Sequence, residues 1–155
     1  MSLLFIWAAI ILLFGILEPN TFLTLNNFRT ILSDQAITAI MALSLLLPIA
    51  CNAFDLSVGG AMGLAVIIVT QLMVPVGWSI WLSVVVTLLV GVTIGCANAF
   101  FILKLRVNSF IATLGMSTVL IGLQLWFGAV PVAYGVPNAY LNIGRTTFLT
   151  IPMFV

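Results

Sequence analysis

The fold is decided by one apolar stretch, "LSVGGAMGLAVIIVTQLMVPVGWSIWLSVVVTLLVGVTIGCANAFFIL", which runs from Leu56 to Leu103 without a charged residue. It is too long for one membrane helix, because a helix crosses the apolar core of a bilayer in roughly 20 residues. Near its middle, Pro75 and Gly77 in "VPVGW" interrupt the helical pattern. The stretch therefore predicts two spans, 57–74 and 79–103, joined by a tight turn.

The composition places the chain in a lipid bilayer. Of its 155 residues, 64% are hydrophobic and 5% are charged, and it has no histidine. A soluble domain carries about 25% charged residues, so lipid rather than water must cover this surface. The net charge of +1 and the scattered charges argue against a nucleic-acid partner. Cys51 and Cys96 lie in apolar segments without a neighbouring ligand residue, so we expect small buried side chains rather than a disulfide or a metal pair.

Three further spans are predicted, at 1–17, 36–53 and 109–129. The first has no basic residues before its apolar run and no cleavage site of small residues, which favours a retained span over a signal peptide. The last residues, "TTFLTIPMFV" (146–155), predict the start of a sixth span. We therefore expect residues 1–155 to form a single, all-α, polytopic transmembrane helix bundle of about five spans that is incomplete.

The segments between spans are polar or broken by proline and glycine. Near 24–34, Leu25, Phe28 and Ile31 recur at helical spacing, which favours an amphipathic interfacial helix over a plain polar loop. Residues 130–147 predict a loop on the outside. Lys104 and Arg106 lie in the tightest loop, which positive-inside reasoning places in the cytoplasm. The N-terminus is then cytoplasmic too.

Small residues and one proline bear on how the helices pack. Membrane helices approach closely where small residues line the contact, so glycines at intervals of three, four or seven favour a compact bundle. The candidates are Gly59, Gly60, Gly63, Gly91, Gly95, Gly115 and Gly122. Pro48 lies inside the second span, where it lacks an N–H and crowds the carbonyl of Ser44. It predicts a kink, used either for packing or as a hinge beside a pathway.

An acidic residue precedes the third span in "CNAFDLSVGGAMG" (51–63). Asp55 is able to cap that helix by accepting a hydrogen bond from the N–H of Ser57 or Val58. Alternatively, Asn52, Asp55 and Ser57 face a translocation pathway and bind a polar solute or a gating partner, since ionisable residues at membrane depth often mark such pathways. Asn98, inside the fourth span, is expected to make a packing hydrogen bond between helices.

Two motifs carry a resemblance to a known family. "FDLSVGGAMGL" (54–64) resembles the D-L-S-V-G signature of the membrane permeases of bacterial ATP-binding-cassette sugar importers of the ribose, xylose and galactose type, within the branched-chain-permease-like superfamily. "VNSFIATLGMSTVLIGLQLWFG" (107–128) is similar to their second signature. The similarity runs over residues 18–155, and the chain resembles the N-terminal half of such a permease. Ser109 stands where the family commonly has proline, and residues 51–53 replace a glycine pair.

The resemblance implies a transport subunit rather than an enzyme. The working assembly would contain a second permease chain, an ATPase subunit that uses the ATP, and an extracytoplasmic sugar-binding protein, all at the bacterial inner membrane. This chain would bind no cofactor and no metal itself, and it has no P-loop and no set of catalytic residues. The alternatives are a truncated permease that serves only as a membrane scaffold, and a small channel or secondary carrier without an ATPase.

Overall fold

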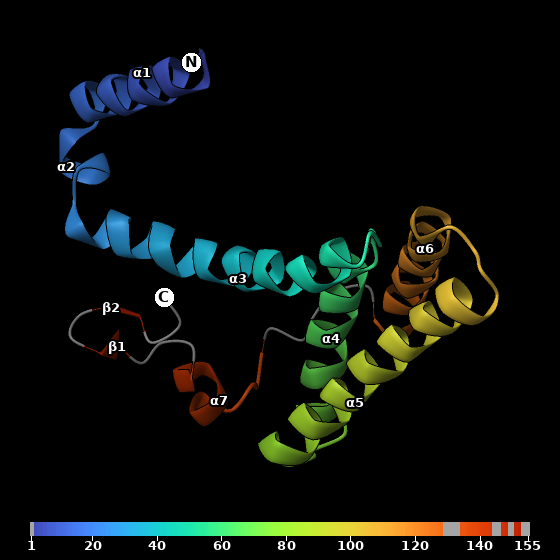
Figure 1. Ribbon diagram of the computed structural model, residues 1–155. Coiled ribbons are helices and arrows are strands. Elements are labelled where there is room, and N and C mark those ends of the chain that lie inside the picture. Colours follow the sequence, from blue (N-terminus) through green and yellow to red (C-terminus); the bar gives the residue numbers. More distant parts are fainter. Residues whose placement is uncertain (1, 129–133, 144–146, 149–150, 153–155) are drawn as a thin grey trace. The chain divides into compact units, whose positions relative to one another are not determined.

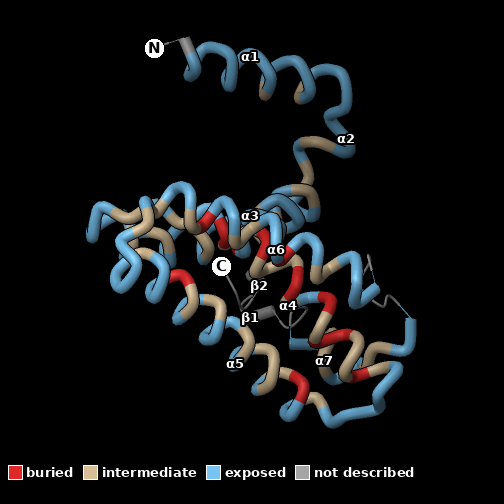
Figure 2. The backbone as a smooth tube through the Cα atoms, turned by 90° about the vertical axis from the view of Figure 1, so that its right-hand side faces the viewer, coloured by how far each residue is buried: buried red, intermediate tan, exposed pale blue. Residues whose placement is uncertain are grey.

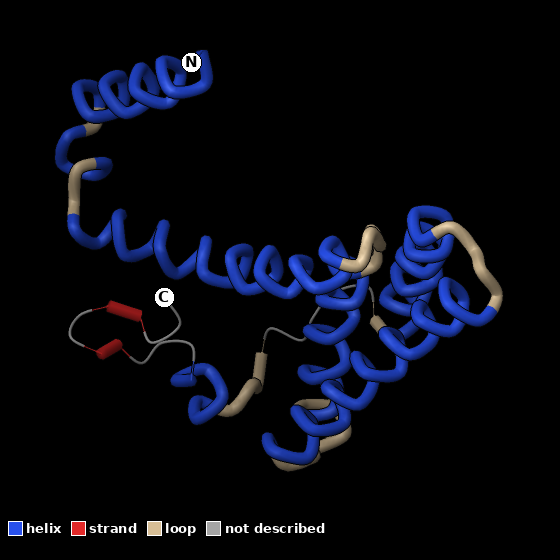
Figure 3. Tube along the Cα trace, in the orientation of Figure 1, coloured by secondary structure: helices blue, strands red, loops and turns tan. Residues whose placement is uncertain are grey.

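The computed structural model of the chain describes residues 2–128, 134–143, 147–148 and 151–152 (Figures 1 and 3). Most of them are helical, which confirms the predicted all-α class. The chain divides into two compact units, residues 1–40 with 144–155 and residues 41–143. Each unit is described separately below.

The first unit is built from α1 (Ser2–Leu17), α2 (Pro19–Phe22) and the first part of α3 (Leu25–Ala50). Pro19 begins α2, a position where its missing N–H costs nothing. Before α3, the Thr24 hydroxyl accepts from the Asn27 N–H at 3.2 Å. The predicted interfacial helix (24–34) and second span (36–53) lie largely on one continuous helix, because the sequence has no glycine or proline between Leu25 and Leu47.

The C-terminal residues of this unit include two short strands. Thr147–Phe148 (β1) pairs antiparallel with Ile151–Pro152 (β2), with Thr147 opposite Pro152. These strands lie where the start of a sixth span is predicted. The rest of that stretch, residues 146, 149–150 and 153–155, falls outside the described residues, so the sixth span stays a prediction. The described part of the predicted outside loop (130–147) also includes a short helix of the second unit, α7 (Asn138–Ile143).

The second unit is centred on α4 (Val58–Met73). This helix packs against both α5 (Ile80–Ala99) and α6 (Ser109–Phe127). Its core consists mainly of apolar side chains on α4 together with Leu120 of α6, and the buried positions in Figure 2 accordingly gather along α4. α5 continues into one turn of π-helix, η1 (Phe100–Lys104). The unit is thus a helix bundle with α4 as its most buried member.

The helix ends follow the sequence closely. α4 ends at Met73, and Gly77 in the following turn has a φ of 76°, which a glycine adopts without strain. Ser79 caps α5 by accepting from the Leu82 N–H at 3.4 Å. Asn108 caps α6 by accepting from the Phe110 N–H at 2.9 Å. Side chains of types that favour helix starts therefore set the beginnings of α5 and α6.

Within the described residues, three helices are long and apolar enough to cross a membrane: Leu25–Ala50, Ile80–Lys104 and Ser109–Phe127. Two shorter apolar helices, Leu3–Leu17 and Val58–Met73, accompany them. The second of these has 16 residues, which makes it about 24 Å long against a bilayer core of roughly 30 Å. Residues beyond its ends must therefore complete a crossing by α4.

The prediction that both cysteines are buried was wrong. Cys51, after α3, and Cys96, on α5, are exposed on the surface of the chain. In a soluble protein an apolar segment faces inward. Here the outward face is apolar as well, since lipid covers it, and an apolar neighbourhood no longer predicts burial.

Candidate functional site: a polar cluster before α4

An extended segment separates α3 from α4. Residues 53–57, called the linking segment below, have no regular secondary structure. The end of α3 is closed by the Pro48 carbonyl, which accepts from the N–H groups of Cys51 at 3.0 Å and Ala53 at 2.9 Å. Asn52 then takes a left-handed conformation with a φ of 55°, which asparagine tolerates better than most residues. The predicted kink at Pro48 stays a prediction, since α3 continues through it to Ala50.

Two side chains at the start of α6 hold the backbone of the linking segment. The Ser109 hydroxyl accepts from the Phe54 N–H at 3.2 Å, and the Thr113 hydroxyl accepts from the Leu56 N–H at 3.1 Å. The Thr113 hydroxyl also donates, to the Phe54 carbonyl at 3.1 Å and to the Ser109 carbonyl at 2.8 Å. Non-helical backbone is tolerated in a membrane only where such partners or water satisfy it. α6 supplies those partners here.

The Asp55 carboxylate accepts hydrogen bonds from Ser57, two residues further along the chain. Its Oδ1 atom accepts from the Ser57 N–H at 2.8 Å and from the Ser57 hydroxyl at 2.6 Å. The helix itself begins at Val58, and no side chain caps its first turn. Asp55 thus accepts from one of the two predicted N–H groups, but it closes a turn ahead of α4 rather than capping the helix. Its side chain is half-buried, whereas that of Ser57 is buried.

Asn98 of α5 completes the cluster from the other side. Its Nδ2 atom donates to the Ser57 hydroxyl oxygen at 2.8 Å. This bond joins α5 to the linking segment, whereas the hydrogen bond predicted for Asn98 was one between two helices. The residue is only 5% exposed, and its Oδ1 atom has no hydrogen-bond partner among the described residues. Asp55, Ser57 and Asn98 therefore form a hydrogen-bonded row, called the polar row below, that ends in a buried acceptor left unpaired by the described part of the chain.

The predicted site residues are only partly brought together. Asp55 and Ser57 belong to the polar row, whereas Asn52 lies exposed on the preceding turn and takes no part in it. Ser109 and Thr113 were missed as site residues. The one available signal was their place in the second family signature, at the start of the helix that follows a charged loop.

The predicted packing glycines divide into two groups. Gly60 and Gly63 face α6, where Gln124 Nε2 donates to the Gly60 carbonyl at 2.9 Å. A side chain on the others would meet no described atom within 4 Å, so their packing role stays a prediction; these are Gly59, Gly91, Gly95, Gly115 and Gly122. Lys104 and Arg106 are exposed at the end of η1 and in the loop after it.

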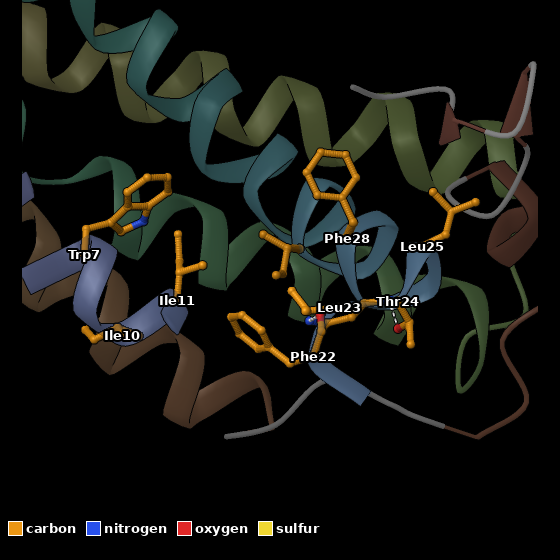
Figure 4. A pocket seen from close by; sticks show the side chains of 10 residues that line it. Trp7, Ile10, Ile11, Phe22, Leu23, Thr24, Leu25 and Phe28 are labelled. Atoms are coloured by element: carbon orange, nitrogen blue, oxygen red, sulfur yellow. Dashed lines mark hydrogen bonds between the residues drawn. The ribbon is translucent and has the colours of Figure 1, made fainter. Parts of the chain in front are cut away.

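An apolar recess lies wholly in the first unit, between α1, α2 and the start of α3 (Figure 4). Its volume is about 680 Å³, and its walls are mainly apolar side chains such as Trp7, Ile11 and Phe28. Its polar residues already bond locally: Thr24 donates to the Thr21 carbonyl at 2.9 Å, and Asn27 Nδ2 donates to the Phe22 carbonyl at 2.8 Å. Such a recess offers little to a hydroxylated solute, and the polar row is the better candidate.

Comparison with known proteins identifies the family. Residues 27–150 match the family described as the permease component of the branched-chain amino acid transport system. The match covers most of the chain, which therefore belongs to this permease family. Together with the long apolar helices, this makes the chain a membrane protein.

Several similar proteins are named as permeases of transport or import systems. The chain is 28% identical over 149 residues to the D-allose transport system permease protein of Escherichia coli, covering 96% of this chain and 46% of that one. It is 39% identical over 145 residues to the autoinducer 2 import system permease protein of Klebsiella pneumoniae, covering 92% and 41%. It is 32% identical over 145 residues to the ribose import permease protein of Escherichia coli, covering 90% and 44%.

The chain spans less than half the length of these relatives and matches their N-terminal part. No solved structure is significantly similar to it.

Proposed function

We propose that this chain is the transmembrane permease component of an ATP-driven sugar importer in the bacterial inner membrane, where it forms part of the translocation pathway. The observation that carries the proposal is the extent of the similarity. Permeases named for D-allose and ribose align over at least 90% of this chain. The chain spans less than half the length of each of these relatives.

The proposal divides the work among several components. An ATPase subunit binds and hydrolyses ATP, a second permease chain completes the membrane path, and an extracytoplasmic binding protein delivers the sugar. This chain supplies helices and polar side chains along the path, without a cofactor and without catalytic residues. ATP binding then biases the path between states that open to opposite sides of the membrane. Asp55 and Ser57 are the pathway residues, with Asn52 at the adjoining turn.

The proposed orientation places the polar row near the cytoplasmic end of the path. Lys104 and Arg106 face the cytoplasm, as does the N-terminus. Asn98 precedes Lys104 by six residues and Thr113 follows the start of α6 by four, so both lie about 6–9 Å inside the helix ends. The linking segment at this depth is non-helical backbone held by side-chain hydrogen bonds. Discontinuous helices of this kind line the solute sites of many transporters.

The test is uptake of labelled D-ribose, D-allose and D-xylose by source cells that lack this chain, and by the same cells after its return. We expect uptake of at least one sugar to fall to background and to recover with the wild-type chain. The Asp55→Asn variant should recover at most about a tenth of it, because hydrogen bonds to a charged group are worth roughly 1.5–3 kcal/mol. Asp34→Asn makes the same change at an exposed carboxylate of α3 and should recover full uptake.

Two results would contradict the proposal. If cells without this chain take up all three sugars as before, the chain has no part in sugar import. Uptake that needs the chain but continues in cells depleted of ATP would instead indicate a channel or a secondary carrier.

A further inference from the structure

The Ser57 hydroxyl is held as proteins hold the hydroxyl of a sugar. It donates its proton to Asp55 Oδ1 at 2.6 Å and accepts a proton from Asn98 Nδ2 at 2.8 Å. A carboxylate only accepts, an amide nitrogen only donates, and a hydroxyl does both at once. The two partners come from different elements, the linking segment and α5, and they converge on this one oxygen atom.

The same place has hydrogen-bonding capacity left over. Asn98 Oδ1 is a buried acceptor with no partner among the described residues, on a side chain that is 95% covered. The first turn of α4, a helix of 16 residues, has no side-chain cap. It therefore presents free N–H groups at the positive end of the helix. A side chain on Gly59, in this first turn, would meet no described atom within 4 Å, so the backbone can be approached closely there.

We propose that a hydroxyl of the transported sugar replaces the Ser57 hydroxyl between Asp55 and Asn98, and that a neighbouring hydroxyl donates to Asn98 Oδ1. The inference rests on the proposed function and deepens it by naming the groups that recognise the solute. Ser57 acts as an internal stand-in for the sugar when the site is empty. Asn98, on α5, becomes a residue that determines specificity.

The mixture of donors and acceptors selects a neutral polyol. An anion would be repelled by the Asp55 carboxylate. A cation would face the Asn98 amide hydrogens and the N–H groups at the start of α4. A sugar hydroxyl both donates and accepts, so adjacent hydroxyls can satisfy both kinds of group.

The proposal predicts opposite effects for two substitutions in the polar row. Ser57→Ala removes the internal competitor and should tighten sugar binding by about three- to tenfold, the range of one or two hydrogen bonds. Asn98→Leu removes a partner of the sugar and should weaken binding by a similar factor. If the polar row has a purely structural role, both substitutions should weaken sugar binding.

The experiment measures binding of labelled D-ribose to the permease complex purified from source membranes through this chain. Ser83→Ala is the control for Ser57→Ala, because Ser83 is a buried serine of α5 whose hydroxyl donates to the carbonyl of the cap residue Ser79, away from the polar row. Gln124→Leu is the control for Asn98→Leu, since it removes an amide that bonds α4 outside the row. Both controls should bind D-ribose as the wild type does.

A series of monodeoxy analogues separates recognition from structure. In the wild type, at least one analogue should bind about three- to tenfold more weakly than D-ribose, and in Asn98→Leu that difference should disappear. Comparing the two ratios cancels any contribution that the sugar-binding protein makes equally to both. An equal ratio in wild type and Asn98→Leu, or weaker binding by Ser57→Ala, would overturn the inference while leaving the proposed function intact.

Two other outcomes remain decisive. A wild-type complex that is recovered intact but imports and binds none of D-ribose, D-allose and D-xylose would sink the proposed function itself. If the variants fail to assemble, the wild-type series decides alone, measured on permease complex from which the sugar-binding protein has been removed. Monodeoxy analogues that all bind as tightly as D-ribose would then overturn the inference, and one weakened analogue would support it.

Discussion

Replacing Thr113 by valine tests how the linking segment is held in place. Valine keeps the shape of this side chain, which is 1% exposed, and removes only the hydroxyl. The Leu56 N–H then loses its acceptor at 3.1 Å, and the Phe54 carbonyl loses a donor at 3.1 Å. Side-chain hydrogen bonds in membrane proteins contribute about 0.6 kcal/mol on average and about 1.7 at most. Losing two should therefore lower the free energy of unfolding by about 1–3 kcal/mol.

The assay is equilibrium unfolding in mixed micelles with increasing dodecyl sulfate, followed by circular dichroism. Thr118→Val is the matched control, because it makes the same change on the same helix, where the hydroxyl donates to the Leu114 carbonyl of α6 at 3.1 Å. We expect the control to stay within about 0.5 kcal/mol of the wild type. If Thr113→Val is no less stable than Thr118→Val, α6 does not hold the linking segment as described.

Three further predictions concern packing, the polar row and orientation. Gly60→Ala places a methyl group 3.3 Å from Leu120 Cβ and should lower the stability by about 1–3 kcal/mol. Gly59→Ala meets no described atom and should raise the stability by up to about 1 kcal/mol through helix propensity. Thermal unfolding in detergent distinguishes the two variants. Asn98→Leu should change the unfolding free energy by less than about 1 kcal/mol, because it removes both a bond and a buried unpaired acceptor; a larger loss would make Asn98 chiefly structural. A membrane-impermeant maleimide should label Cys51 in inside-out vesicles but not in intact spheroplasts, and the reverse pattern would invert the proposed orientation.

The elements were largely predictable from the sequence, because apolar run length and turn residues determine them locally. Pro75 and Gly77 mark the turn after α4, and Ser79 begins the next helix as its side chain suggests. The continuity of α3 was less visible. Asp34 and its polar neighbours suggested a boundary, but none of them breaks a helix, and hydropathy alone does not distinguish a change of surroundings from an end of the helix.

Only the part of the site that lies within one short segment was predictable from the sequence. Asp55 and Ser57 are two residues apart, so their hydrogen bond is local. Asn98 reaches Ser57 because α5 packs on α4. How one helix is rotated against another cannot be read from the sequence by local patterns. The same uncertainty explains why Gly60 faces α6 at close range whereas its neighbour Gly59 does not.

The most direct test of the central claim is sugar transport by the complex purified through this chain and reconstituted into proteoliposomes with ATP inside. The account predicts that labelled sugar accumulates only when ATP is present on the ATPase side and the sugar-binding protein is outside. A complex that passes sugar down its gradient without ATP, or one that contains no ATPase and moves no sugar, would contradict it.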